Sequence, residues 1–307
     1  MSDSLPLVSI VTPSYNQGAF IEETLRSVLS QDYLRIEYIV VDGGSTDGTL
    51  SILRKYEDRL TWFSEPDKGQ SDAINKGFQK SQGEILAWLN SDDIYLPGAV
   101  RTAADYLTVH PDVAMVYGDC NMVDEQGQVL GRSIWVEDFD LRRLVEDINY
   151  IHQPTAFFRR QAFEDVGMLD IDLHYCMDYD LWIRIGKKYP VRHIPRVLAS
   201  IRVYPHTKTA SGGEDRWQEV FEISRRHGGG IFAPRYHHAE RAYYYARLGL
   251  RCLRNGKVKE AMNRFDKAVE SWPAINLSVL VTAGVKIIMY RRLSSAAKGS
   301  ASGGFNT

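Results

Sequence analysis

The start of the chain alternates between two short β-branched segments and a helix. Residues 7–12 and 36–41 are almost continuously apolar, which is typical of strands that are buried on both faces of a sheet. Between them, Ile21, Leu25 and Val28 recur at the spacing of one face of an α-helix. A strand, a helix and a second strand of these lengths form a crossover unit, in which the two strands are parallel. The chain is therefore predicted to begin as a parallel sheet.

The same alternation continues along the next part of the chain. The predicted elements are a strand at 61–64, a helix at 70–80, a strand at 84–89, a helix beginning at Pro97 and a strand at 113–117. After Gly118 the pattern becomes mixed, with a hairpin turn at 124–127, a helix at 139–147 and a strand at 155–158. We therefore expect an α/β fold with a doubly wound, mainly parallel sheet flanked by helices.

A helical extension is predicted to follow the sheet domain. Ser211, Gly212 and Gly213 mark a boundary, and a turn at residues 255–256 joins the two helices beyond it, the second of which ends before Pro273. The first helix presents Ala242, Ala246, Gly249 and Leu253 on one face, and the second presents Val258, Ala261, Met262, Phe265, Ala268 and Val269. The predicted domains are a sheet domain at 1–211 with halves at about 1–118 and 119–211, an all-α hairpin extension at 212–293 and a disordered tail at 294–307.

Composition and charge exclude several classes of protein. The formal net charge of −2 argues against a nucleic-acid partner, because such proteins usually carry a surplus of basic residues. The three cysteines show no metal-type spacing and fit a reducing compartment. Since the first residues do not resemble a signal peptide, we expect a cytoplasmic protein. The apolar stretch at 275–290, followed by basic residues, is interpreted either as a helix packed on the hairpin or, through 275–292, as a peripheral membrane contact.

Polar clusters follow four successive predicted strands. They are Pro13-Ser14-Tyr15-Asn16, Asp42-Gly43-Gly44-Ser45-Thr46-Asp47, Glu65-Pro66-Asp67-Lys68-Gly69 and Asn90-Ser91-Asp92-Asp93. Each cluster taken alone is also explained as a turn or a helix cap, with Ser45 or Asp47 as the capping residue of the second. Four of them at the carboxyl ends of neighbouring parallel strands indicate a shared ligand crevice instead.

The adjacent carboxylates of Asp92 and Asp93 indicate a particular ligand chemistry. Hard oxygen ligands without a nearby histidine or cysteine suit Mg²⁺ or Mn²⁺, which proteins bind through one or two carboxylates together with substrate phosphates. The sequence lacks the usual phosphate-binding loops with lysine or with three spaced glycines. The crevice is therefore predicted to hold a phosphorylated substrate through a metal ion.

Five segments in this order resemble the family 2 glycosyltransferases of the GT-A fold. They read VSIVTPSYNQ, EYIVVDGGSTDGT, EPDKGQSDAINKG, GEILAWLNSDD and MDYDLWIRI, and they cover roughly residues 7 to 211. The resemblance implies an inverting transferase that moves a sugar from a nucleotide diphosphate donor, of which a UDP-sugar is the type most often used by the family. The first half of the sheet domain would then bind the nucleotide-sugar, and the second half would bind the acceptor.

The resemblance also implies roles for individual residues on the donor side. The nucleotide-binding positions would be Pro13, Tyr15, Asn16, Asp42, Asp72 and Asp92. Asp93 would bind Mn²⁺ or Mg²⁺, and His206 matches a position on a loop that reaches the metal or the diphosphate, with a plain surface histidine as the alternative. Asn90 stands where the family often has an aspartate, which leaves open how tightly metal binds before the donor arrives.

On the acceptor side, Asp178 takes the position of the family's catalytic base. An attacking hydroxyl must lose its proton, and a positioned carboxylate can accept it; a single displacement then inverts the anomeric centre. The neighbouring Asp180 is the other candidate, and one of the two aspartates is expected to cap the following helix. His152, Gln153 and Trp182 would bind the acceptor, a hydroxyl of a glycan or a lipid-linked glycan, although His152 is equally explained as a buried structural histidine.

The sequence argues against two other enzyme classes and against one non-enzymatic function. A sugar nucleotidyltransferase would carry basic residues in the first loop, which here reads PSYNQGAF. A processive polysaccharide synthase would need membrane spans and a glutamine where Gly213 stands. The alternative without catalysis is an inactive transferase-like scaffold that binds partners through its C-terminal helices, and it predicts loss of the metal and base positions, whereas Asp93 and Asp178 are both present.

Overall fold

The computed structural model describes residues 5–134, 136–231 and 233–271. The chain is divided into two compact units. The first contains Met1–Phe139 and Tyr150–Tyr204, and the second contains Asp140–Asn149 and Pro205–Thr307. The predicted boundary between residues 211 and 212 stays a prediction.

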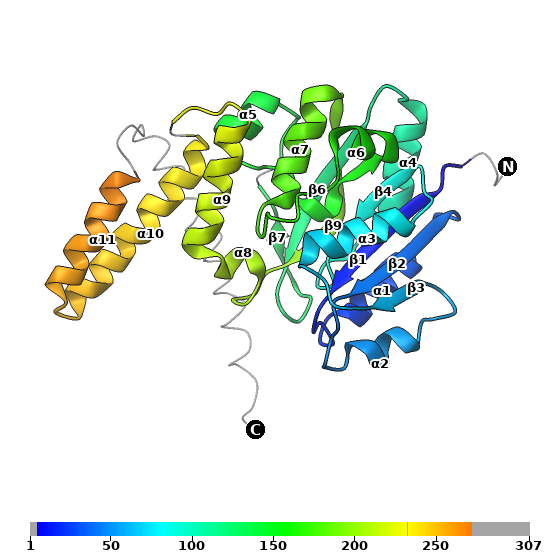
Figure 1. Ribbon diagram of the computed structural model, residues 1–307, viewed down its shortest axis with the longest axis horizontal. Helices are drawn as coiled ribbons and strands as arrows, with labels where there is room; N and C mark the ends of the chain where they lie inside the picture. The colour runs from blue at the N-terminus through cyan, green and yellow to red at the C-terminus, as the bar shows by residue number, and fades with distance from the viewer. Residues whose placement is uncertain (1–4, 135, 232, 272–307) are drawn as a thin grey trace. The chain divides into compact units, whose positions relative to one another are not determined.

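A single mixed sheet forms the centre of the first unit (Figure 1). Its strands are β1 (Val8–Ser14), β2 (Ile36–Asp42), β3 (Thr61–Ser64), β4 (Ile85–Trp88), β5 (Ile94–Tyr95), β6 (Met115–Val123), β7 (Val129–Arg132), β8 (Phe157–Arg159) and β9 (Val191–Arg202). They are ordered β3-β2-β1-β4-β8-β6-β9-β5, with β7 paired to β6. Strands β1 to β4 are parallel, while β8 runs antiparallel to both β4 and β6. The predicted α/β sheet, parallel at first and mixed later, is confirmed.

The register of the strands brings the predicted ligand loops to one edge of the sheet. Ser14 lies beside Asp42, which in turn lies beside Ser64, so β1, β2 and β3 end together. Because β8 is antiparallel to β4, the 3-10 turn η2 (Gln153–Thr155) that precedes it lies at this same edge. Strands β6 and β9 run parallel to β4, so the end of β9 at Arg202 also reaches this edge.

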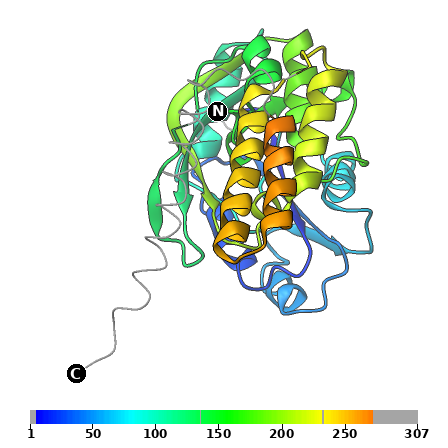
Figure 2. The same ribbon diagram turned by 90° about the vertical axis from the view of Figure 1, so that its left-hand side faces the viewer.

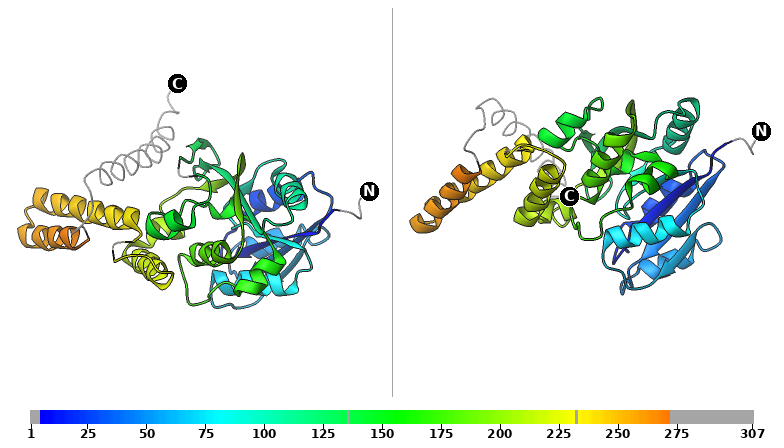
Figure 3. Two further views of the ribbon diagram at one scale, coloured as in Figure 1. Left: turned by 90° about the horizontal axis from the view of Figure 1, so that it is seen from above. Right: turned by 45° about the horizontal axis from the view of Figure 1, so that its top comes forward.

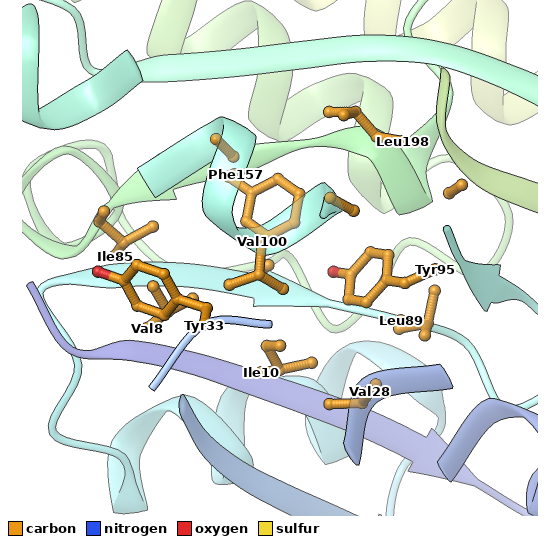
Figure 4. Packing of buried hydrophobic residues seen from close by; sticks show 14 of the residues in the cluster. Val8, Ile10, Val28, Tyr33, Ile85, Leu89, Tyr95, Val100, Phe157 and Leu198 are labelled. Carbon is orange, nitrogen blue, oxygen red and sulfur yellow. The ribbon is translucent and has the colours of Figure 1, made fainter. Parts of the chain in front are cut away.

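Helices cover both faces of the sheet, and the alternation of side chains along β1 shows which helix covers which face. The helices of this unit are α1 (Ile21–Leu29), α2 (Thr49–Arg54), α3 (Gln70–Lys80), α4 (Ala99–Val109), α6 (Arg160–Val166) and α7 (Met177–Lys188). Ile10 belongs to the core formed with α1 and α4, which also includes Val100 and Phe157 (Figure 4). Its neighbour Val11 faces α3, where a Cβ on Gly77 would lie 2.5 Å from a methyl group of Val11. Only a glycine allows α3 to pack this closely on β1.

The structure differs from the sequence-based expectations mainly at short elements and helix starts. The helix α2, the strands β5 and β9 and the helix α6 were not predicted, and α4 begins at Ala99 rather than at Pro97. The expected helix cap by an aspartate is wrong, because Cys176 is the N-cap of α7 and both Asp178 and Asp180 lie in its first turn. Gly48, rather than Ser45 or Asp47, is the N-cap of α2.

In the described part of the second unit every regular element is a helix, and the helices predicted for the C-terminal extension are present. This unit contains α5 (Leu141–Glu146), α8 (Lys208–Ser211), α9 (Gly213–Arg226), α10 (Arg235–Arg254) and α11 (Val258–Glu270). Helices α10 and α11 lie side by side (Figures 2 and 3), and Gly249 of α10 meets the ring of Phe265, where an added Cβ would lie 2.7 Å from a ring carbon. The predicted apolar face of α11 is only partly buried, because Ala261 and Ala268 are covered whereas Met262 is 55% exposed.

Several predictions concern residues outside the part of the chain that the structure describes. These are the membrane or packing helix at 275–292 and the tail at 294–307. The second hairpin helix, α11, is described to its end at Glu270, which lies before Pro273 as predicted. Among the residues that are described, no helix is both long enough and apolar enough to cross a bilayer.

Candidate active site

The loops after β1 and β2 are joined by hydrogen bonds from Asn16. Its backbone N–H donates to Oγ of Ser45 at 2.7 Å, and its side-chain oxygen accepts a bond from the N–H of Thr46 at 2.9 Å. Asn16 has a positive φ of 53°, which asparagine tolerates better than most residues. Pro13 is buried in β1, whereas Tyr15 is 59% exposed. The joined loops therefore present the Tyr15 ring to solvent, where a flat ligand could stack on it.

Asp42, at the end of β2, is fully buried and accepts four hydrogen bonds. The donors are the N–H groups of Gly44 at 3.1 Å and Ser45 at 2.8 Å, together with the hydroxyls of Ser45 at 2.5 Å and Ser64 at 2.6 Å. Three of these bonds go to Oδ2 and one goes to Oδ1. In this structure Asp42 shapes the loops after β2 and β3, and its contact with a nucleotide stays a prediction.

The loop after β3 packs on the loop after β2 and leads into α3. A Cβ on Gly43 would lie 2.6 Å from a carboxylate oxygen of Asp67, so the two loops are in close contact at this position. Asp72, in the first turn of α3, accepts a bond from the N–H of Lys68 at 3.0 Å and pairs with Lys76 at 3.2 Å. The bond from Lys68 is the main reason that the pKa of Asp72 is lowered. Asp72 is thus a fixed negative charge beside these loops.

Asp92 and Asp93, here called the acidic pair, follow β4 at the same edge of the sheet. Asp93 is only 6% exposed; its Oδ1 accepts the backbone N–H of Arg202 at 3.1 Å, and Asn90 donates to its Oδ2 at 3.3 Å. The hydroxyl of Tyr204 donates to Oδ2 of Asp92 at 3.0 Å. Burial raises the pKa of both carboxyls, and the charge of Asp92 raises that of Asp93 further. Two desolvated carboxylates side by side form a site that a cation would stabilise.

The chemistry of the acidic pair fits a divalent ion that the substrate helps to bind. Asn90 is not arranged as a ligand, because its side-chain oxygen accepts a bond from Gln70 at 2.6 Å and its amide group donates to Asp93. Within the described ranges, no group of three or more histidine, cysteine, aspartate or glutamate residues is arranged to hold a metal ion. One or two carboxylates plus phosphate oxygens is the usual ligand set of Mg²⁺, so these residues fit an ion of this type.

Gln153 links the predicted acceptor segment to the strand that carries the acidic pair. Its amide group donates to the carbonyl of Trp88 at 2.7 Å, while its Oε1 is buried and has no hydrogen-bond partner. The preceding His152 contacts Oγ of Ser133 through Nε2 at 2.6 Å, and burial lowers its pKa to about 4. His152 is therefore neutral near pH 7. The free acceptor oxygen of Gln153 is the type of group that binds a ligand hydroxyl.

Trp182 does not lie on an open surface. Its side chain is fully buried and stacks on Trp88, with ring centroids 5.3 Å apart. Because no part of the ring is exposed, Trp182 contributes to the core on the α3 side of the sheet rather than to an acceptor surface.

The two aspartates in the first turn of α7 have different surroundings. Asp180 is 2% exposed and pairs with Arg184 at 2.7 Å. Asp178 is half-buried, and its Oδ1 accepts the N–H of Tyr179 at 2.8 Å. Asp180 is thus engaged in a structural ion pair, and Asp178 is the more accessible carboxylate. His206 is exposed and belongs to the second unit, so its metal role stays a prediction.

Sequence reasoning did not identify the residues that hold these groups in place. Arg202 and Tyr204 contact the acidic pair from the end of β9, and Gln70 orients Asn90. The signal available in the sequence was their position just before His206. This position in the sequence does not show which strand end Arg202 and Tyr204 reach, because β9 is placed by its pairing with β6 and not by a local pattern.

Comparison with known proteins identifies the family. The sequence model of glycosyl transferase family 2 matches residues 9–167. An uncharacterized glycosyltransferase of Rickettsia typhi is 32% identical over 65% of this chain and 64% of its own length, and one of Rickettsia conorii is 30% identical over 64% of this chain and 34% of its own length. The chain thus spans less than two thirds of these two relatives. A glycosyltransferase of PGL/p-HBAD biosynthesis from Mycobacterium bovis is 32% identical over 58% of this chain and 69% of that protein.

Solved structures show the same fold at low sequence identity. The mannosyltransferase PcManGT from Pyrobaculum calidifontis, in complex with GDP-Man and Mn²⁺, has a TM-score of 0.59 at 22% identity and covers 98% of this chain and 85% of its own. Residues 1–349 of S. aureus TarS in complex with UDP give a TM-score of 0.56 at 21% identity and cover 98% of this chain and 94% of their own. The sheet order, the strand-end loops and the match over residues 9–167 agree, and the chain belongs to glycosyl transferase family 2 with a GT-A type of fold.

Proposed function

We propose that this protein is an inverting glycosyltransferase that moves a sugar from a nucleotide diphosphate donor, a UDP-sugar, to a hydroxyl of a glycan or lipid-linked acceptor. The observation that carries the proposal is the acidic pair, a buried Asp93 beside a half-buried Asp92, at the edge of the sheet where the loops after β1, β2 and β3 also lie. Family membership supports the reaction, and the structural relatives that were solved with UDP or with GDP-Man and Mn²⁺ support the donor class.

The donor side uses groups from all four strand-end loops. The nucleotide-binding residues are Pro13, Tyr15, Asn16, Asp42, Asp72 and Asp92. Asp93 holds Mn²⁺ or Mg²⁺, with His206 as a second metal ligand, and an ion bound there supplies positive charge to the leaving diphosphate. The exposed ring of Tyr15 offers a stacking surface for the base, while the fixed charge of Asp72 is suited to hydroxyl groups of the nucleoside.

The acceptor side needs a base and a binding surface. Asp178 accepts the proton of the acceptor hydroxyl as the hydroxyl oxygen bonds to the anomeric carbon and the bond from that carbon to the diphosphate oxygen breaks. Attack opposite the leaving group inverts the configuration. Gln153 and the neutral His152 beside it are the proposed acceptor-binding residues; the amide group of Gln153 is held by the carbonyl of Trp88, and His152 contributes hydrogen bonding without a charge.

The donor half is tested by calorimetric titration with UDP, GDP and dTDP, each with Mn²⁺, with Mg²⁺ and with EDTA. We expect selective binding that requires the metal and is lost in Asp93→Ala. Asp58→Ala, which removes an exposed carboxylate after the end of α2, is the matched control and should bind normally. Absence of binding by every nucleotide under every condition would contradict the proposed enzyme and return the inactive scaffold as the function.

The stereochemical part of the proposal has a separate test. Transfer from an α-linked UDP-sugar should give a β-linked product, which the coupling constant of the anomeric proton reports by NMR. A product that retains the donor configuration would rule out the single displacement with Asp178 as base.

A further inference from the structure

Arg202 is a buried arginine that forms hydrogen bonds with both members of the acidic pair. Its side chain is 1% exposed, and its Nε donates to the carbonyl of Asp92 at 3.0 Å. Its own N–H donates to Oδ1 of Asp93 at 3.1 Å. The same residue therefore holds the backbone of one aspartate and the carboxylate of the next.

The rest of the Arg202 guanidinium is tied to two other parts of the sheet domain. One terminal nitrogen donates to the carbonyls of Asp124 at 3.0 Å and Glu125 at 2.9 Å, in the turn between β6 and β7. The other donates to Oε2 of Glu23 on α1 at 2.6 Å. The ring of Phe20 lies against the guanidinium, 5.0 Å from its central carbon. These contacts use the fork of an arginine in a way that a lysine cannot reproduce.

Tyr204 completes the arrangement two residues later. Its hydroxyl donates to Oδ2 of Asp92 at 3.0 Å, and its ring packs on Phe20 with centroids 5.1 Å apart. Only the Oδ2 oxygen of Asp92 takes part in the hydrogen bond from Tyr204.

We propose that Arg202 and Tyr204 are positioning residues for the acidic pair: Arg202 fixes the backbone that carries Asp92 and the carboxylate of Asp93, and Tyr204 fixes the rotamer of Asp92. Two adjacent carboxylates repel each other and would otherwise turn apart. Held in this way, they are ready for the donor and its metal ion without reorganisation, which strengthens binding. The inference rests on the proposed function, since it gives these two residues a role in binding the donor.

The test for Tyr204 is Tyr204→Phe, which removes the hydroxyl and keeps the ring on Phe20. We expect the Kd for UDP in the presence of Mn²⁺ to rise about tenfold, which corresponds to loss of one hydrogen bond to a charged group. Tyr56→Phe is the matched control, because Tyr56 donates an equivalent bond to Glu22 at 3.0 Å on the exposed side of α1. This control should bind UDP as the wild type does.

A double-mutant cycle shows whether Tyr204 acts through Asp92. In an Asp92→Asn background, Tyr204→Phe should have little further effect on the Kd, because the interacting carboxylate is already gone. Equal effects in both backgrounds would overturn the positioning role of Tyr204, and so would normal UDP binding by Tyr204→Phe.

The test for Arg202 is Arg202→Lys, measured in the same titration after its fold is checked by circular dichroism. We expect at least about a tenfold rise in Kd, because a lysine cannot reach all the acceptors. If Arg202→Lys does not fold, Glu23→Gln is measured instead, because it keeps Arg202 and weakens one of its bonds. This variant should raise the Kd for UDP about threefold. Wild-type binding by these variants would overturn the role of Arg202. Since the wild type must first bind UDP with Mn²⁺, failure of the proposed function shows in the wild type itself, and failure of this inference shows only in the variants.

Discussion

The two aspartates at the start of α7 should respond in opposite ways to the same substitution. Asp178→Asn should abolish most of the transfer while leaving the protein stable, because Asp178 is half-buried and is the proposed base. Asp180→Asn should destabilise the protein, because Asp180 is buried and paired with Arg184. Asparagine has nearly the shape of aspartate, so both changes remove a charge and little volume.

The contacts of Asp180 set the size of the stability effect. The Arg184 Nε lies 2.7 Å from Oδ2 of Asp180, and the two side chains are 20% and 3% exposed. Breaking a buried pair by removing one partner costs about 3–5 kcal/mol. Arg184 also donates to the carbonyls of Val166 at 2.8 Å, Gly167 at 2.7 Å and Met168 at 3.0 Å, and these bonds survive the substitution. We therefore expect a loss near the lower end, about 3 kcal/mol.

For Asp178→Asn the expected loss is in the rate. A positioned general base typically contributes a factor of about 10²–10⁴, so the single-turnover rate with saturating donor should fall by that factor. The Kd for UDP with Mn²⁺ should not change, because the base acts on the acceptor. Thermal unfolding followed by circular dichroism, measured on both variants, gives the stability comparison.

The reverse pattern would contradict the assignment of Asp178 as the base. If Asp180→Asn lost the transfer rate at unchanged stability while Asp178→Asn stayed active, Asp180 would be the base. If both variants kept the wild-type rate, neither aspartate would accept the proton.

Three further predictions concern buried groups. Burial lowers the pKa of His152 from 6.5 to about 4, so between these pH values His152 is protonated in the unfolded chain but not in the folded protein. The wild type should therefore lose about 3 kcal/mol of stability as the pH falls from 6.5 to 4. His152→Gln should lack this component of the pH dependence when urea unfolding is measured at a series of pH values. Gly77→Ala should cost about 1–3 kcal/mol because its Cβ would meet Val11 at 2.5 Å, whereas Gly48→Ala, with open space around it, should leave the Tm nearly unchanged. Burial alone would raise the pKa of Glu240, but the neighbouring Arg216 and His237 lower it to about 2. Glu240→Gln should therefore cost about 3 kcal/mol of stability above pH 4.5. In the same assay, the difference in stability from the wild type should shrink as the pH falls toward 2.

Local sequence patterns were sufficient to predict the elements that have a clear hydrophobic periodicity and polar residues at both ends. The strand at 61–64 and the helix at 70–80 have the predicted bounds, because each is a short apolar or amphipathic run bordered by polar residues. Elements such as β5 and β9 were missed, since β5 has only two residues and β9 alternates irregularly between buried and exposed positions. Their place is decided by pairing with distant strands, which no local pattern contains.

The sequence by itself determined that the chain is an α/β protein, that its polar loops follow strand ends, and which residue types those loops carry. Parallel strands bring their carboxyl ends to one edge, so the shared site followed from the order of elements alone. Only the tertiary structure decided how each polar group is used. Asp42 accepts four internal bonds, Trp182 is buried, and the backbone of Asp92 is held by Arg202 from 110 positions along the chain. Burial and long-range hydrogen bonding depend on which segments meet in space, and that is a property of the folded chain rather than of any segment.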